Sequence, residues 1–317
     1  MLAAATAFAV SLCAAAVLLK GFGARALDQP NERSLHERPV PRTGGIALAA
    51  GVGAALVFGA GELWLQMTLA LALAVVSFID DVALLPVLAR LAAHFAAAAA
   101  LAWYVLSPMH PLELALLVLV VVWMTNLYNF MDGADGLAGG MALSGFSAYA
   151  LAAHLAGQGE LAMVCAAIAA AALGFLVFNF HPARLFLGDV GSIPLGFLSA
   201  ALGITGWRDD AWPLWFPLLV FAPFVGDATL TLLRRILRRE RVWRAHREHY
   251  YQRLVRMGLG HRRTALIAYV LMAVCAAAAL MGRAQPPAMQ AAVFAGTTIL
   301  LAAVAIWVDV KWARRPA

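Results

Sequence analysis

Apolar stretches of about 20 residues follow one another along almost the whole chain, with short polar segments between them. An α-helix of that length extends about 30 Å, which matches the hydrocarbon core of a bilayer. The stretches lack the alternation of apolar and polar residues that strands of a membrane barrel show. The pattern therefore predicts about eleven transmembrane helices, in the ranges 2–19, 44–61, 63–79, 88–106, 112–128, 138–155, 161–179, 191–206, 213–233, 264–282 and 289–308.

The composition supports the same class of protein. Of the 317 residues, 63% are hydrophobic and 13% are charged, whereas a soluble domain is nearer half apolar and a quarter charged. We therefore expect an all-α integral membrane protein in which residues 1–317 form one polytopic domain. Cys13, Cys165 and Cys275 all lie in apolar stretches, so small buried residues are expected rather than disulfides.

The distribution of basic residues predicts the orientation of these helices. All but two of the 23 Lys and Arg residues fall in alternate loops, on one side of the membrane. The positive-inside rule places those loops and the C-terminus in the cytoplasm, and the N-terminus outside. The net charge of +6 then reflects topology and suits an anionic substrate, and nucleic acid is not indicated as a partner. The cytoplasmic loops expected to build the site are residues 20–43, 80–90, 128–137, 180–191 and 234–263.

One segment, NLYNFMDGADGLAGG at residues 126–140, places polar side chains at every third position after an apolar run. These side chains are Asn126, Asn129, Asp132 and Asp135. Four residues at this spacing sweep about half the circumference of a helix end, and carboxylates at membrane depth are costly and usually functional. The alternative is an N-cap cluster for the next helix, which explains one Asp but not the two Asn upstream. The pattern favours one wall of a polar cavity.

Three further carboxylates end predicted helices or lie in loops on the same side. Asp80 and Asp81 close LALAVVSFIDD, and Asp189 lies between two glycines in GDVGS. Adjacent carboxylates repel each other, which implies a cation or a raised pKa. Mg²⁺ prefers oxygen ligands and is shared with substrate phosphates, so Asp189 is the candidate metal ligand. Asn179, in FLVFNF, is another amide at a helix end here, with interhelical hydrogen bonding as its alternative role.

The last predicted cytoplasmic loop is rich in arginine, which is typical of a positive-inside segment. His246 and His249 are three residues apart, so one helical face can carry both, and Arg253 follows four residues later. Such a face would bind a diphosphate. A zinc site is disfavoured because no Cys and no third nearby His completes it.

Five segments stand in order along the chain: PRTGGIA, FIDDV, NLYNFMDGADGLAGG, FLVFNFHPARLFLGDVGS and AHREHYYQRL. On these segments, the chain resembles the polyprenyl-phosphate N-acetylhexosamine-1-phosphate transferases, relatives of phospho-N-acetylmuramoyl-pentapeptide transferase. The resemblance covers roughly residues 25–260. It implies an enzyme of the bacterial inner membrane, with its active site at the cytoplasmic face. The implied reaction transfers N-acetylhexosamine-1-phosphate from a UDP-sugar to undecaprenyl phosphate and releases UMP, with Mg²⁺ or Mn²⁺ as cofactor and often a homodimer.

The resemblance also implies roles for residues of this chain. It places the Asp80–Asp81 pair at the acceptor phosphate, without deciding which of the two contacts it, and Asp189 at the metal. The candidate catalytic residues are Asp80, Asp81, Asp132 and Asp189. The candidate substrate-binding residues are Arg90 (by a looser match), Asn126, Asn129, Asp135, Asn179, His246, His249 and Arg253.

The HREH pattern differs from the consecutive histidines of the peptidoglycan enzyme. It looks more like the branch that initiates O-antigen or capsule-type glycans, which disfavours a muramoyl-pentapeptide donor and leaves UDP-GlcNAc, UDP-QuiNAc and UDP-FucNAc open. We favour direct attack by the acceptor phosphate over a covalent intermediate. A cation- or proton-coupled transporter is the alternative class, but it would place its carboxylates near the bilayer midplane, often in repeated halves.

Overall fold

The computed structural model of the protein describes residues 1–21, 27–30, 34–36, 38–59, 61–106, 110–241 and 246–315. It is a bundle of α-helices with one small ribbon of two-residue strands, β1 (Leu27–Asp28) and β2 (Val40–Pro41), which pair antiparallel. The helices are α1 (Leu2–Gly21), α2 (Gly44–Ala55), α3 (Trp64–Ala83), α4 (Val87–Leu106), α5 (Pro111–Phe130), α6 (Leu137–Leu155), α7 (Gly159–Asn179), α8 (Asp189–Arg208), α9 (Trp215–Val220), α10 (Ala222–Leu237), α11 (Tyr250–Leu254), α12 (Gly260–Gly282) and α13 (Pro287–Ala313).

Helices of membrane-spanning length dominate the described part of the chain. Eight helical segments there are long and apolar enough to cross a bilayer, judged by length and composition. They are Leu2–Gly21, Gly61–Ala83, Val87–Val105, Pro111–Phe130, Gly159–Asn179, Asp189–Arg208, Tyr250–Gly282 and Pro287–Ala313. The expectation of a helical membrane protein is confirmed, while eleven crossings and their orientation stay predictions.

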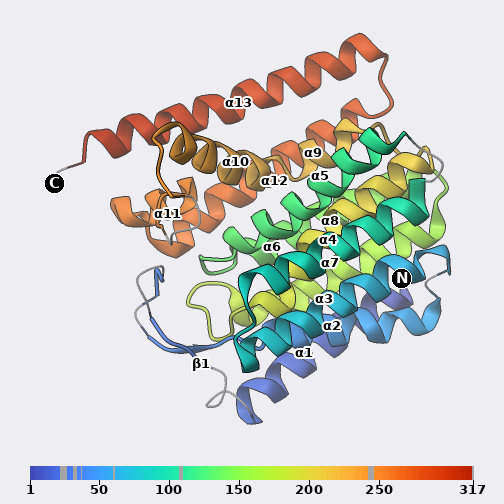
Figure 1. Ribbon diagram of the computed structural model, residues 1–317, viewed down its shortest axis with the longest axis horizontal. Coiled ribbons are helices and arrows are strands. Elements are labelled where there is room, and N and C mark those ends of the chain that lie inside the picture. The colour runs from blue at the N-terminus through green and yellow to red at the C-terminus, as the bar shows by residue number, and fades with distance from the viewer. Residues whose placement is uncertain are drawn as a thin grey trace.

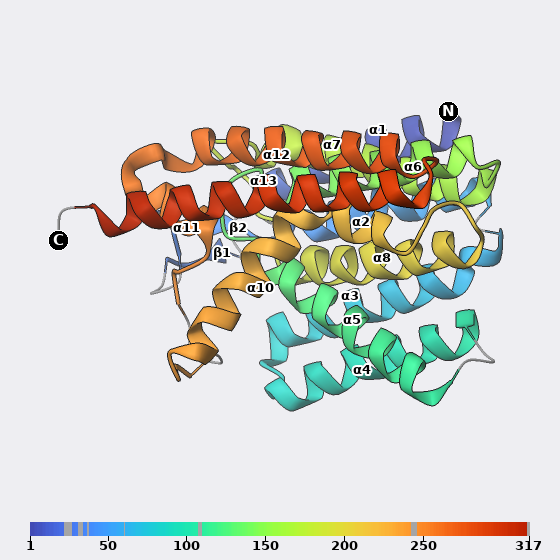
Figure 2. The same ribbon diagram turned by 90° about the horizontal axis from the view of Figure 1, so that it is seen from above.

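Helix α8 lies at the centre of the bundle. It packs against α2, α3, α4, α5, α6 and α9, and buried residues occur all round it, from Val190 to Gly206. Helix α13 is the outermost helix and lies beside α12 (Figure 1). Helix α4 forms another edge of the bundle, next to α3 and α5 (Figure 2). The first residue of α8 is therefore surrounded by the ends of several other helices.

The segments that carry the candidate residues gather at one end of the bundle. The β1–β2 ribbon, the α5–α6 and α7–α8 connections and α11 all lie at that end (Figure 1). Short connections between long antiparallel helices return every second connection to the same end. That geometry brings together residues that are far apart in the sequence.

Several boundaries differ from the expected ones, and two of them have a consequence for the site or a clear cause in the sequence. The ninth expected span, 213–233, is divided into α9 and α10 at Phe221, where Pro223 occupies the first turn of α10. Proline is favoured in a first turn and disrupts a helix interior, so a new helix begins there. Helix α5 ends at Phe130, so Asp132 and Asp135 lie beyond the helix, and the expectation that they end it is wrong.

Candidate active site

Asp189 is the centre of a cluster of polar groups contributed by several elements. It is the first residue of α8, preceded by the N-cap Gly188, whose positive φ of 71° suits glycine. Its carboxylate accepts a hydrogen bond from Asn129, near the end of α5, and interacts electrostatically with Arg42, Arg90 and Asp80. The structure thus brings together five residues that are far apart in the sequence. Asp80, Arg90, Asn129 and Asp189 were candidates from the sequence, and Arg42 was not.

The N-terminal segment reaches this cluster through a close backbone contact. The amides of Gly44 and Gly45 donate hydrogen bonds of 2.9 and 2.8 Å to carbonyls of the α7–α8 connection. A Cβ on Gly45 would collide with the backbone of Gly191 in α8, so glycine permits the approach. The contact sets Arg42 beside the cluster. Arg42 is missing from the candidate set, although PRTGG placed it directly before a predicted helix.

The adjacent carboxylates at the end of α3 have different partners. Asp80 accepts from Arg90 Nη1 at 2.8 Å and from the amide of Leu85 at 2.8 Å, so both of its oxygens are engaged. Asp81 Oδ1 lies 3.2 Å from Arg42 Nη2. The two carboxylates are therefore held apart, each by its own arginine, and Asp81 makes fewer contacts with protein donors in the described structure.

Asp132 faces Asp189 from the turn that follows α5. Its carboxylate accepts a hydrogen bond from the amide of Gly188, next to Asp189. Burial, and then the Asp189 carboxylate, raise the pKa of Asp132 to about 7. Asn129, one turn earlier, accepts a 2.9 Å hydrogen bond from Ser192 Oγ, which ties the end of α5 to the first turn of α8.

The donor set is compatible with a magnesium ion. No group of three or more His, Cys, Asp and Glu side chains that could hold a metal occurs in the part of the chain that the structure describes. Mg²⁺ is commonly held by one or two carboxylates, with waters and substrate phosphates completing its shell. Asp189 and Asp132 supply two such carboxylates, and their mutual repulsion would be relieved by a cation.

Asp135 turns away from Asp132 and joins two histidines. Its Oδ2 lies 2.7 Å from His181 Nδ1, and its Oδ1 lies 3.2 Å from His261 Nδ1. The two imidazole rings stack, with centroids 5.8 Å apart. Burial alone would raise the pKa of Asp135, but its hydrogen bonds with His261, His181 and the Ala183 amide lower it. Neither histidine was singled out from the sequence, because the pairing depends on a contact between α12 and two loops.

Two candidate amides are already bonded to the protein. Asn179 is buried, accepts from the amide of Gly136 at 3.0 Å and donates to the carbonyl of Leu185 at 2.9 Å. It thereby joins the α5–α6 connection to the α7–α8 connection, whereas the alternative role considered for it was hydrogen bonding between helices. Asn126 Nδ2 donates to the Val122 carbonyl at 2.7 Å and lies 3.3 Å from His94 Nδ1. A role for either amide in substrate binding stays a prediction.

The histidine segment is arranged differently from the expected helical face. Helix α11 begins at Tyr250, so His246 precedes the helix and His249 is its N-cap. The two imidazole centroids nevertheless lie 4.9 Å apart. Burial, followed by His249 and Arg235, lowers the pKa of His246 to about 4, so this imidazole is neutral at pH 7.

Arg253 lies on the other side of α11. Its Nη1 donates a 2.9 Å hydrogen bond to Asp309 of α13, and its guanidinium also lies over the rings of Tyr250 and Trp312. The expectation of a single face carrying both histidines and Arg253 is therefore wrong. A role for Arg253 in substrate binding stays a prediction.

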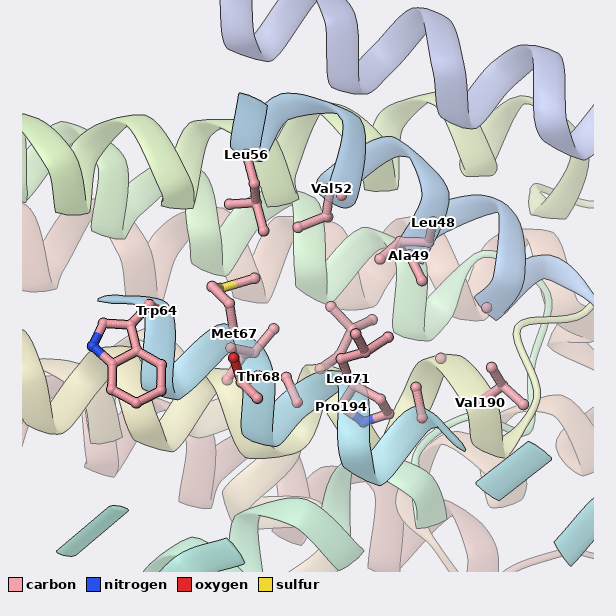
Figure 3. A pocket seen from close by; sticks show the side chains of 17 residues that line it. Leu48, Ala49, Val52, Leu56, Trp64, Met67, Thr68, Leu71, Val190 and Pro194 are labelled. Carbon is pink, nitrogen blue, oxygen red and sulfur yellow. The ribbon is translucent and has the colours of Figure 1, made fainter. Parts of the chain in front are cut away.

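An apolar groove begins next to the carboxylate cluster. It lies between α2 and α3, with α8 as its floor, and has a volume of about 270 Å³. Gly45, Val190 and Gly191 line its inner end, beside Asp189, and Leu56 and Trp64 line its far end. Side chains of α2 and α3 face each other across it (Figure 3). From Gly45 to Leu56 a helix advances about 17 Å, so the groove runs about that far along the apolar faces of α2, α3 and α8.

Comparison with known proteins identifies the family. A family model described as glycosyl transferase family 4 matches residues 63–207. The chain is 30% identical to a probable undecaprenyl-phosphate N-acetylglucosaminyl 1-phosphate transferase of Bacillus subtilis, over 78% of this chain and 74% of that relative. The chain belongs to glycosyl transferase family 4. The region matched to the family contains all four candidate catalytic residues, Asp80, Asp81, Asp132 and Asp189.

Two further relatives have related names. A decaprenyl-phosphate N-acetylglucosaminephosphotransferase of Mycobacterium tuberculosis is 32% identical, over 87% of this chain and 80% of that relative. A phospho-N-acetylmuramoyl-pentapeptide-transferase of Moorella thermoacetica is 48% identical, but over only 32% of this chain and 29% of that relative. The resemblance read from the five segments is thereby confirmed at the level of the family.

Proposed function

We propose that this family 4 member transfers N-acetylhexosamine-1-phosphate from a UDP-sugar to a polyprenyl phosphate, undecaprenyl phosphate in the first instance. The observation that carries the proposal is the cluster of Asp80, Asp81, Asp132 and Asp189 with Arg42 and Arg90, at one end of helices long enough to cross a bilayer. A lipid-borne phosphate and a water-soluble nucleotide can meet only at such an end.

The reaction exchanges one phosphoanhydride bond for another. An oxygen of the acceptor phosphate bonds to the β-phosphorus of the UDP-sugar, and the bond from that phosphorus to the bridging oxygen breaks. UMP leaves with the bridging oxygen, and the product is a polyprenyl-diphosphate sugar. Both reactants are anions, so the site must offset their repulsion, and the Arg42 and Arg90 guanidiniums supply positive charge beside the carboxylates.

Asp189 and Asp132 are proposed to hold Mg²⁺, with Mn²⁺ as the alternative. When bound, the ion supplies positive charge to the donor diphosphate and to the leaving UMP. Asn129 orients the Asp189 carboxylate through its hydrogen bond, and the Gly188 amide orients that of Asp132. These two contacts keep the carboxylate oxygens in place before the substrates arrive.

Asp81 is the better candidate of its pair for contact with the acceptor phosphate. Both oxygens of Asp80 are engaged by Arg90 and the Leu85 amide, whereas Asp81 pairs with Arg42 alone among the described ion pairs. The acceptor phosphate is already largely ionised at neutral pH, so Asp81 would orient it or remove a last proton. Asp80 would hold Arg90 in place beside Asp189.

The apolar groove is proposed to accommodate part of the acceptor's isoprenoid chain. Its inner end adjoins Asp189, and its walls are apolar from Gly45 to Leu56. A chain lying there would keep its phosphate at the carboxylate cluster without leaving the bilayer. We also propose that the chain crosses the membrane eleven times, with its N-terminus outside. The site would face the cytoplasm of a bacterial inner membrane, and the protein would form a homodimer.

N-acetylglucosamine is the first sugar to test, because the relatives from Bacillus subtilis and Mycobacterium tuberculosis carry it in their names. The product would begin a cell-envelope glycan, of which an O-antigen is one example. The deciding experiment measures UMP release by purified protein from UDP-GlcNAc, UDP-QuiNAc and UDP-FucNAc, with and without undecaprenyl phosphate and Mg²⁺. We expect release that requires both additions. Release without the lipid, or none with any of the three sugars, would contradict the proposal.

A further inference from the structure

Asp227 is a buried carboxylate of α10 that the transfer reaction as described above does not use. Its side chain is 8% exposed. Its Oδ1 accepts a 2.9 Å hydrogen bond from the amide of Tyr250, and its Oδ2 accepts a 3.0 Å hydrogen bond from the amide of Tyr251. The same Oδ1 lies 3.2 Å from His249 Nδ1, and Thr231 Oγ1 lies 3.3 Å from it. The Asp227 carboxylate thus accepts hydrogen bonds from the first two backbone amides of α11.

These contacts determine how His249 is held. Asp227 Oδ1 lies beside His249 Nδ1, and the His249 side chain also accepts a hydrogen bond from the backbone amide of Gln252. The imidazole is therefore held in position by α10 on one side and by the first turn of α11 on the other. The first amides of a helix have no partner within the helix, so the carboxylate also satisfies donors that would otherwise be buried and unpaired.

The same segment contacts the turn that carries Asp132. The His249 ring stacks on Phe130, with centroids 6.3 Å apart and the planes 28° from parallel. The Tyr251 hydroxyl donates a 3.0 Å hydrogen bond to the Phe130 carbonyl, directly before that turn. A displacement of α11 would therefore move His249 relative to the carboxylates proposed to bind the donor diphosphate.

We propose that Asp227 is a positioning residue for the transfer reaction, holding His249 and the start of α11 against the turn that carries Asp132. The inference rests on the proposed function. Asp309 of α13 provides a contrast, because it accepts hydrogen bonds from Arg253 and the Tyr250 hydroxyl of the same segment and from Arg234 of α10, and does not contact His249. Asp227 thus acts on the histidine, and Asp309 acts on the packing of α11 against α13.

The test is a double-mutant cycle between Asp227→Asn and His249→Gln, read as UMP release. Asp227→Asn keeps the volume but removes the charge and replaces one acceptor by a donor. We expect each single variant to lower kcat by about 10- to 100-fold, with the KM for the UDP-sugar changed less than about 3-fold. If Asp227 acts through His249, the double variant is no slower than His249→Gln alone. Losses that multiply in the double variant would overturn the proposal.

Thr231→Val is the matched control. It removes a hydroxyl near the same carboxylate without touching α11, so its kcat is expected to stay within about 3-fold of that of the parent protein. An Asp227→Asn protein with the activity of Thr231→Val would overturn the proposal.

A second measurement does not depend on activity. Hydrogen exchange of peptides covering residues 246–254 is expected to accelerate in Asp227→Asn, because the Tyr251 amide loses its acceptor, while peptides of α5 and α8 keep their protection. Unchanged exchange in the α11 peptides would overturn the proposal, even if the parent protein released no UMP and the proposed function had failed. Loss of protection throughout the chain would also overturn it, because Asp227 would then support the whole fold.

Discussion

Two groups of carboxylates lie at the same end of this molecule, and the protein satisfies them differently. Asp227 and Asp309 accept hydrogen bonds from backbone amides, arginines and a tyrosine around α11. Asp132 and Asp189 face each other, and the pKa of Asp132 is raised to about 7 by burial and by Asp189. A carboxylate whose oxygens accept hydrogen bonds from the protein holds the chain in place. Two carboxylates that repel each other leave oxygens that can coordinate a ligand.

The strongest test of this comparison exchanges one carboxylate for an amide in each group. Asp189→Asn is expected to lower UMP release by about 10³-fold, because the charge that faces the cation and the diphosphate is lost. Its melting temperature is expected to be unchanged or higher, since repulsion with Asp132 disappears. Activity and thermal unfolding in detergent would be measured on the same preparation.

Asp309→Asn is the matched variant of the second group. It weakens the contacts of α13 with Arg234 and Arg253, and is expected to lower the melting temperature by about 3 °C or more with a smaller loss of activity. If Asp309→Asn proved as inactive as Asp189→Asn while remaining folded, the distinction between the two groups would not hold.

A second test separates the two carboxylates at the end of α3. Asp81→Asn is expected to lower kcat/KM for undecaprenyl phosphate by about 10²-fold at unchanged stability, because Asp81 is the one with fewer protein partners. Asp80→Asn is expected to lower the melting temperature as well, since it loosens Arg90 and the Leu85 amide. The reverse pattern would assign the acceptor to Asp80.

A third test extends the comparison into the apolar groove. Ala49 lines the groove, whereas the neighbouring Ala50 is exposed outside it. Ala49→Phe is expected to raise the KM for undecaprenyl phosphate by about 10-fold and to leave the KM for the UDP-sugar unchanged. Ala50→Phe should change neither constant. Equal effects of the two substitutions would mean that the isoprenoid chain lies elsewhere.

The last test concerns the stability that Asp135 contributes, because its hydrogen bonds with His261 and His181 outweigh burial and lower its pKa below the ordinary 3.8. A lowered pKa means that the ionised carboxylate stabilises the fold above pH 3.8, and that this stabilisation is lost as the pH falls through the lower folded value. Asp135→Asn is therefore expected to melt about 3–5 °C lower at pH 7, with the difference shrinking as the pH falls below 3.8.

Asp209→Asn serves as the reference for this effect. It breaks a partly exposed ion pair with Arg208 at the opposite end of α8, and such pairs contribute little. Thermal unfolding of both variants across the pH range would show whether the two histidines around Asp135 stabilise the fold. A constant difference between Asp135→Asn and the parent protein at all pH values would contradict that reading.

The sequence predicted the helices better than the contacts between them. Helix α3 ends two residues after Asp81 and α8 begins at Asp189, close to the expected boundaries. The polar residues at every third position were expected to share one helix end, and that part of the prediction is wrong. Asn126 and Asn129 lie on the helix, whereas Asp132 and Asp135 lie beyond it and point to different partners.

What the sequence determined by itself follows from local physical requirements. A segment of about 20 apolar residues must satisfy its own backbone hydrogen bonds in a bilayer, so helices of membrane-spanning length could be predicted. The costly carboxylates that interrupt such segments marked Asp80, Asp81, Asp132 and Asp189 as candidates. These arguments need only the order of residues along the chain.

The tertiary structure alone decided which of these groups are available to a ligand. Arg42 reaches Asp81, and His181 and His261 reach Asp135, through contacts between segments that are distant in the sequence. Likewise, the Asp227 oxygens accept hydrogen bonds from backbone amides of α11, whereas the Asp132 carboxylate faces that of Asp189. Whether a carboxylate finds a donor or another carboxylate depends on which helix ends pack together, and no pattern within one segment contains that information.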